Sequence, residues 1–268
     1  MDADLSDLLD DWPYVPGRLN VRLIEGTDGQ PRIQVRLDLG ILQMRLDGRP
    51  DGQRPHGFDS LLEYFEAGLD ENQSHGAWGQ AQGVGDEDPL AGPEAEHEAF
   101  TLSSEDGRAL REEAIQYYHR YIALLALEDF DRVVRDTTRN LRVLDLCAAH
   151  AQNEADRNAL EQFRPYITMV RTRALASQAL KDDEPKAAIL AIDDGLEDLR
   201  RYFADRGDAD SFERSAEVEM LRGMRESLVP KLPVSQKSEL RQRLNDAIQQ
   251  ENYELAAILR DELRMLKE

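Results

Sequence analysis

Residues 237–268 read KSELRQRLNDAIQQENYELAAILRDELRMLKE, and two amphipathic repeats follow each other in this stretch. In the first repeat the apolar residues fall on one helical face, at Leu240, Leu244, Ala247 and Ile248. In the second repeat they fall at Ala256, Leu259, Leu263 and Leu266. The polar run 249–252 separates the repeats, and Asn252 is suited to cap the second helix. The stretch therefore predicts a helical hairpin, in which Ala256 and Ala257 let Leu244 and Ile248 pack closely.

The same residues carry a family resemblance. The pattern Leu-x3-Leu-x2-Ala-Ile from Leu240, followed by Glu-Asn-Tyr-Glu-x-Ala-Ala-x-Leu-Arg-Asp-x-Leu from Glu251, resembles the UVR motif. This helical hairpin is shared by the excision-repair proteins UvrB and UvrC, and it also occurs in Clp-protease regulators such as McsA and in the Clp ATPase ClpC. The resemblance is confined to the last residues of the chain. It implies a hairpin that pairs with another UVR hairpin or with a partner protein and that is not a catalytic element.

We predict that the hairpin forms a partner-binding surface. Polar specificity at the rim of this surface is assigned to Arg260 and Asp261. The residues assigned to packing and contact are Leu244, Ile248, Tyr253, Ala257, Leu259 and Leu263. The resemblance implies a UvrB- or UvrC-like partner, hence DNA excision repair, or a ClpC-like partner, hence regulated proteolysis. McsA-like regulators carry Cys-x-x-Cys zinc sites that this chain lacks, which argues against the second. A homodimer formed by two such hairpins is the alternative.

The charge of the chain is strongly acidic and unevenly distributed. The net charge is -21 at pH 7, and residues 58–107 hold 13 Asp or Glu and no Lys or Arg. Direct nucleic-acid binding needs a basic surface, so we expect none. The single cysteine, Cys147, excludes an intrachain disulfide framework and indicates a reducing cytoplasm. No signal peptide and no run of 18 apolar residues is evident, so we expect no membrane association.

The first part of the chain alternates apolar and polar residues with a period of two. Residues 18–46 contain three such runs separated by glycine-containing turns, which predict an antiparallel β-meander. One face would carry Arg22, Arg32 and Arg36, either exposed to solvent or docked on an acidic segment. Residues 12–17 predict an extended lead-in pinned to this unit. The apolar stripe of residues 58–69 predicts a helix that covers the apolar face of the meander.

The middle of the chain reads as consecutive helices. We predict helices at 104–127, 130–151, 158–180, 185–204 and 211–228, with Ser104 as the first cap and Pro185 opening the fourth. A shift of 55 residues superimposes the first pair on the second, including the turn between the helices. This weak repeat resembles tetratricopeptide (TPR) arrays, which present a binding groove. A plain helical bundle is the alternative.

The predicted fold class is therefore mainly α: a TPR-like array of helical hairpins, with a small N-terminal antiparallel β-meander plus helix and a C-terminal UVR helical hairpin. The predicted units are an acidic tail at 1–11, a β3-α unit at 12–72, an acidic flexible linker at 73–103, the helical array at 104–229, a hinge at 230–235 and the hairpin at 236–268.

The sequence contains none of the short motifs that mark common catalytic sites. The five histidines are scattered, no H-E-x-x-H or G-x-S-x-G occurs, and Cys147 lies in an Ala/Leu-rich helix. We therefore predict no catalytic residue, no cofactor and no metal site, while an enzyme built from scattered residues remains an alternative. The function expected is a non-enzymatic protein-protein interaction adaptor, and the competing hypothesis is a structural homo-oligomer.

Overall fold

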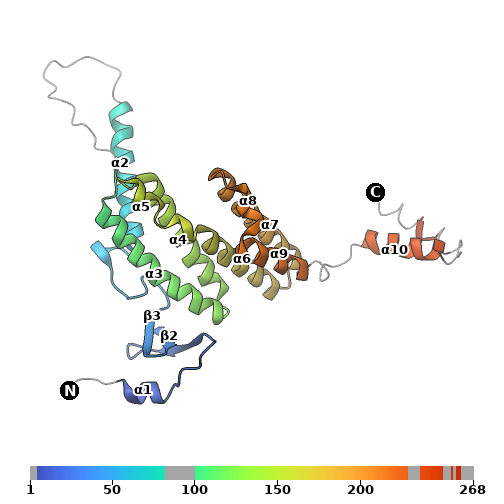
Figure 1. Cartoon of the computed structure of the whole chain (residues 1–268), viewed down its shortest axis with the longest axis horizontal. Coiled ribbons are helices and arrows are strands. Elements are labelled where there is room, and N and C mark those ends of the chain that lie inside the picture. The colour runs from blue at the N-terminus through green and yellow to red at the C-terminus, as the bar shows by residue number, and fades with distance from the viewer. Residues whose placement is uncertain (1–4, 82–99, 229–235, 250–254, 256–257, 261–268) are drawn as a thin grey trace. The chain divides into compact units, whose positions relative to one another are not determined.

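A computed structural model describes residues 5–81, 100–228, 236–249, 255 and 258–260 of the chain (Figure 1). It divides into two compact units, Met1–Arg222 and Gly223–Glu268. The described residues are mainly helical, with one small antiparallel sheet near the N-terminus and helices at the C-terminus, which confirms the predicted fold class. Helix α1 (Ser6–Asp10) precedes the sheet.

The sheet is the predicted meander. Strands β1 (Asn20–Glu25), β2 (Pro31–Leu37) and β3 (Gly40–Arg45) pair in the order β1-β2-β3, both pairs antiparallel. Ile33 of the central strand lies opposite Leu23 on one side and Met44 on the other. Ile33 and Met44 are buried, whereas Leu23 is exposed. The apolar face is therefore buried around the central strand and open at the β1 edge.

The arginine face of the sheet is covered by the N-terminal lead-in. The guanidinium of Arg22 lies 4.0 Å above the ring of Trp12, and Arg36 Nε donates a hydrogen bond to the Trp12 carbonyl at 2.8 Å. Asn20 Nδ2 donates to the Val15 carbonyl at 2.9 Å. Arg36 is buried as a result. The lead-in is thus pinned as predicted. The predicted solvent-exposed arginine face is wrong for Arg36, whose donors are taken by backbone carbonyls rather than by water or carboxylates.

Helix α2 (Leu61–Ala81) packs on other helices and not on the sheet. Its Leu62 is buried in a cluster with Leu110 of α3 and Leu144 of α4, and Leu61, Phe65 and Leu69 pack around it. The prediction that this helix covers the meander is therefore wrong, and α3 contacts β2 instead. The helix also continues to Ala81, into the segment predicted as a linker, and residues 82–99 lie outside the described part of the chain.

One buried carboxylate explains why α2 starts on α3. Glu113 is fully buried, and its Oε2 accepts a hydrogen bond from the backbone N–H of Leu61 at 2.9 Å. Arg49 Nε lies 3.3 Å from the same oxygen, and Arg139 of α4 pairs with the other one. An unsatisfied N–H in the first turn of a helix is stabilised by a negative charge. Glu113 therefore fixes the start of α2 beside α3 and α4.

Four long helices form two successive hairpins: α3 (Ser104–Ala126) with α4 (Phe130–His150), and α6 (Arg164–Lys181) with α7 (Pro185–Asp205). Helix α4 packs against both α3 and α6 (Figure 1). Two short helices, α5 (Glu154–Asn158) and η2 (Glu161–Phe163), connect the hairpins, so α6 starts later than predicted. The cap of α3 is Ser103 and not Ser104, in a capping box with Asp106.

The turns of the two hairpins have the same backbone geometry. Glu128 and Asp183, which are 55 positions apart, both adopt left-handed backbone conformations, with φ of 57° and 61°. Each turn closes with the same pair of bonds, from Asp129 N to Leu124 O and Glu128 N to Leu125 O, and from Glu184 N to Ala179 O and Asp183 N to Leu180 O. These bonds define a Schellman motif. The 55-residue spacing is thus reproduced in the backbone geometry of the two turns, while the resemblance of the helices to a TPR array stays a prediction.

The last helices of the array differ from the prediction. Two helices, α8 (Ala209–Arg214) and α9 (Ala216–Leu228), replace the single helix expected at 211–228. The helix is interrupted at Ser215, whose backbone is extended with ψ of 130°. The Ser215 Oγ accepts a hydrogen bond from the N–H of Val218 at the start of α9. Among the described residues, no helix combines the length and apolar character needed to cross a bilayer.

Candidate functional site

The C-terminal unit contains the predicted hairpin. Its first helix, α10, spans Gln236–Gln249, and helical backbone returns at residues 255 and 258–260. Ala247 of α10 and Leu259 are each only 2% exposed, and Leu244 packs against them. Among the described residues, the two apolar stripes identified in the sequence therefore meet at Leu244, Ala247 and Leu259. Ala247, a minimal side chain, is what Leu259 packs on.

Among the described residues of this unit, three large apolar side chains are exposed outside that core. Ile248 is 50% exposed, Leu255 39% and Ile258 63%. Ile248 was expected to pack on Ala256 and Ala257, which lie outside the described residues, and half of its side chain is exposed. Adjacent helical residues project about 100° apart, so the inward position of Ala247 turns Ile248 outward. We call Ile248, Leu255 and Ile258 the exposed trio.

The predicted partner-binding residues separate into groups. Leu259 and Leu244 form the core of the hairpin, Ile248 is exposed, and Arg260 is also exposed. Tyr253, Ala257, Asp261 and Leu263 lie outside the described residues. The structure adds Leu255 and Ile258, which the prediction missed. Their spacing of three residues was the available signal, one position out of phase with the stripe of Ala256 and Leu259.

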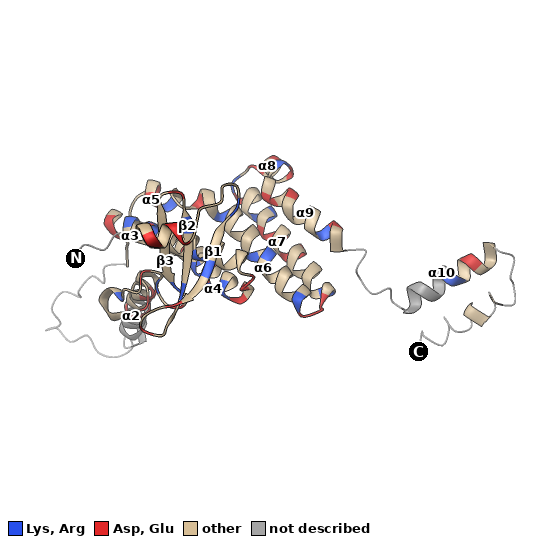
Figure 2. Cartoon of the chain, turned by 90° about the horizontal axis from the view of Figure 1, so that it is seen from below, with Lys and Arg blue, Asp and Glu red and all other residues tan. Residues whose placement is uncertain are grey.

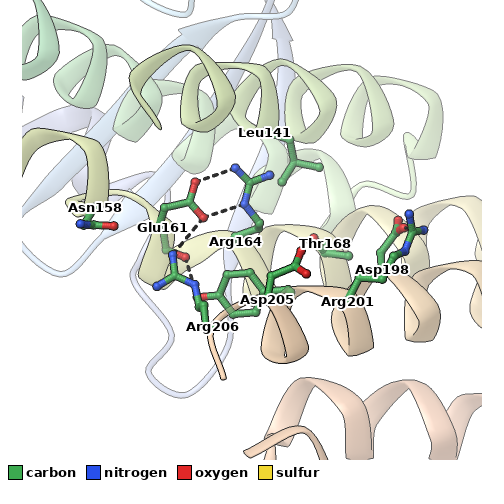
Figure 3. Close-up of a pocket in the computed structure, with 10 residues that line it drawn as sticks. Leu141, Asn158, Glu161, Arg164, Thr168, Asp198, Arg201, Asp205 and Arg206 are labelled. Atoms are coloured by element: carbon green, nitrogen blue, oxygen red, sulfur yellow. Dashed lines mark hydrogen bonds and ion pairs between the residues drawn. The ribbon is translucent and has the colours of Figure 1, made fainter. Parts of the chain in front are cut away.

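A polar hollow of about 670 Å³ lies in the first unit, lined by residues of η2, α6 and α7 (Figure 3). Glu161 accepts hydrogen bonds from Arg164 Nε at 2.8 Å and from Arg206 at 3.3 Å. The Tyr202 hydroxyl donates to the Glu161 carbonyl at 3.0 Å. Burial by itself would raise the pKa of Glu161, but these arginines outweigh it and hold the pKa below its usual value.

The charges around this hollow neutralise one another. Arg164 also pairs with Asp145 at 2.8 Å, and Arg201 pairs with Asp198 at 2.6 Å. Figure 2 shows the same mixture of basic and acidic residues along the helices of the array. Because each of these guanidinium groups already has a carboxylate partner, the hollow offers little to an incoming anion. We interpret it as an ion-pair network that joins η2 to α6 and α7.

Cys147 and the carboxylates give no sign of a reactive centre. Cys147 is 1% exposed, and burial raises the pKa of its thiol to about 11. At neutral pH the group is therefore a protonated thiol in a core, as its Ala/Leu-rich surroundings predicted. Within the described part of the chain, no cluster of three or more His, Cys, Asp or Glu side chains could hold a metal ion.

Comparison with known proteins agrees with the geometry of the C-terminal unit. Residues 235–268 match the family model described as UvrB/uvrC motif. The resemblance seen in the sequence is thereby confirmed, and the exposed trio lies within the matched UvrB/uvrC motif. No curated protein and no solved structure matches the chain.

Proposed function

We propose that this protein is a non-enzymatic adaptor that docks a partner protein through its UvrB/uvrC motif. The observation that carries the proposal is the exposed trio on a small unit. Its described core consists of Ala247 and Leu259, with Leu244 packed against them. A hairpin of this size buries little apolar surface of its own. Covering each partly exposed Ile or Leu contributes roughly 1 kcal/mol to association, so a partner surface would stabilise the hairpin as it binds.

The partner is proposed to carry a hairpin of the same kind. A UvrB- or UvrC-like partner would place the protein in DNA excision repair, and a ClpC-like partner in Clp-type proteolysis. The motif match is compatible with both contexts, and the lack of a Cys-x-x-Cys pair in the chain argues against a McsA-like role in the second. A cytoplasmic location and the lack of direct nucleic-acid contact belong to the same proposal. They are supported by the single cysteine and by the net charge of -21.

A structural homo-oligomer is the second candidate. The same trio could pair with its copy across a twofold axis, because such an interface uses one patch twice. In that case the hairpin would only dimerise the chain, and no further partner would be needed.

The test combines solution mass with direct binding. Light scattering gives the mass of the full chain, of Ile258→Asp and of the control Leu39→Asp, whose side chain is 90% exposed in the first unit. Purified UvrB, UvrC and ClpC from the same organism are then titrated onto each chain. We expect a monomer that binds one of these proteins, with binding weakened about tenfold in Ile258→Asp and unchanged in Leu39→Asp. A dimer that only Ile258→Asp dissociates supports the homo-oligomer. A monomer that binds none of these proteins would contradict both candidates.

A further inference from the structure

A second apolar surface lies far from the hairpin in sequence, between α3 and α6 of the helical array. It is a hollow of about 680 Å³ with Leu144 of α4, Leu160 and Ile167 at its base. These three residues are buried, whereas the walls are open: Ile115 is 54% exposed, Phe163 50% and Tyr118 40%. We call this surface the α3–α6 groove. Volumes of this size are typical of binding sites rather than packing defects.

Aromatic rings connect the two walls of the groove. Tyr118 of α3 stands edge-on to Tyr121 at 5.5 Å between centroids and faces Tyr166 of α6 at 6.4 Å. Large aromatic side chains give contact area at a small entropic cost and are enriched where proteins bind partners. The groove therefore has the residue types of a recognition surface.

The polar group at the base of the groove is already satisfied. Asn140 Nδ2 donates to the Ala114 carbonyl at 2.9 Å, and its Oδ1 accepts from Arg139 at 3.0 Å. Both the amide nitrogen and the amide oxygen of Asn140 are thus engaged within the fold, and the buried side chains around it are apolar, so the base favours apolar groups. An occupant would place large apolar side chains there.

The charges beside the groove are basic on a strongly acidic chain. Arg108 lines the groove at its rim. Arg173 does not line it, but it follows the lining residue Tyr166 by seven residues on α6, so Arg173 and Tyr166 share one helical face. Neither arginine has an ion-pair partner within the ranges that the structure describes. Arg111 at the same rim is neutralised by Asp156 at 2.8 Å, and Glu112 is the acid that lines the groove. The guanidinium groups of Arg108 and Arg173 can therefore receive carboxylates from an occupant.

We propose that the α3–α6 groove binds an acidic peptide segment of a partner protein, with two or three large apolar side chains flanked by Asp or Glu. The groove residues of α3, from Arg108 to Tyr118, span about 15 Å at the rise of an α-helix. An open groove of that length accommodates a peptide better than a compact small molecule. The proposal extends the adaptor function, on which it rests in part, by giving the chemistry of a second partner.

The experiment uses three fluorescein-labelled peptides of fifteen residues and the full chain. The first peptide carries Leu at helical spacing with Glu on both flanks, the second replaces each Glu by Lys, and the third replaces each Leu by Ala. Fluorescence anisotropy gives the Kd of each. We expect micromolar binding of the first peptide only. The variant Ile115→Asp should weaken it about tenfold, and Arg108→Glu with Arg173→Glu should reverse the preference between Glu and Lys peptides.

The controls separate this proposal from the hairpin function. Ile258→Asp should leave peptide binding unchanged, because the hairpin is not the site tested. Circular dichroism verifies that each variant is folded. Ile115, Arg108 and Ile258 are exposed and Arg173 is half-buried, so their substitution need not disturb the core. Equal binding of the Glu and Lys peptides, or no effect of Ile115→Asp, would overturn the proposal. So would a groove that binds the small aromatic anion 8-anilinonaphthalene-1-sulfonate in an Ile115-dependent manner but none of the peptides.

Discussion

Arg120 of α3 and Asp136 of α4 form a two-pronged ion pair, with N–O distances of 2.6 and 2.9 Å and each side chain only 1% exposed. The third nitrogen of Arg120 donates to the carbonyls of Arg45 at 3.2 Å and Gly48 at 2.6 Å, at the end of the sheet. A buried charge is tolerated only when such bonds replace its water. This pair therefore joins the first hairpin to the β-meander.

Breaking the pair from one side should be strongly destabilising. In Asp136→Asn the guanidinium of Arg120 stays buried without its counter-charge, so we expect a loss of about 3 kcal/mol in the free energy of unfolding. Chemical denaturation measures it. The control is Asp198→Asn, because Asp198 and Arg201 form an exposed pair for which less than about 1 kcal/mol is expected. Equal losses in the two variants would contradict the buried role.

The close approach of α6 and α7 depends on Gly195. A β-carbon at this position would overlap the side chain of Thr172 on α6. We expect Gly195→Ala to destabilise the chain by about 1–3 kcal/mol, despite the higher helix propensity of alanine. In Gly223→Ala of α9 nothing lies within 4 Å of the added carbon, so this control should stabilise by about 0.5–1 kcal/mol. Thermal unfolding distinguishes the two signs, and a gain for Gly195→Ala would refute the packing argument.

The repeated turns should respond alike to substitution. Glu128 and Asp183 are exposed and hold a positive φ that L-residues adopt with strain. Glu128→Gly and Asp183→Gly should each raise stability by up to about 1 kcal/mol, since the relief of strain exceeds the entropy lost by glycine. Glu128→Val and Asp183→Val should each lower it by about 1–2 kcal/mol. Melting temperatures test this, and opposite responses of the two sites would show that the turns are not equivalent.

Stability should fall in mild acid through the network around Glu161. The folded pKa of Glu161 is depressed below the ordinary value of 4.5 because Arg164 and Arg206 outweigh its burial. A depressed folded pKa means that the stabilisation is complete above about 4.5 and is lost as the pH falls through the folded pKa. Denaturant titrations at pH 7 and below pH 4 measure the change. In Glu161→Gln the free energy of unfolding should depend less on pH in this range. An unchanged pH dependence in this variant would exclude the role of Glu161.

The helices of the array could be predicted because their signals are local. Apolar residues recur at helical spacing, and Pro185 opens α7 at the position where a missing N–H costs nothing. The start of α6 was misplaced for a related reason. Pro165 occupies the first turn of α6, and a proline is excluded from a helix interior, so the helix begins at Arg164 and not near residue 158.

The candidate site could be predicted only in part. The motif at the C-terminus was recognisable from residues alone, and the apolar stripes do face each other through Ala247 and Leu259. The sequence did not show which apolar residues stay outside the core of the hairpin. A helix turned by one residue, or about 100°, exchanges the buried residue for its neighbour. Ala247 and Leu259 face inward, and their neighbours Ile248 and Ile258 therefore lie at the surface.

The sequence by itself determined the strands and most of the helices, the repeated turn at Glu128 and Asp183, and the terminal hairpin, since each depends on residues close together in the chain. It misplaced the start of α6, the break between α8 and α9 and the end of α2. Only the tertiary structure decided what each apolar stripe covers. The stripe of α2 suits either a sheet or a pair of helices, and the distant Glu113 selects the helices by binding the N–H of Leu61. Likewise Trp12 covers arginines that a local pattern would leave in water, because burial depends on neighbours that the pattern does not contain.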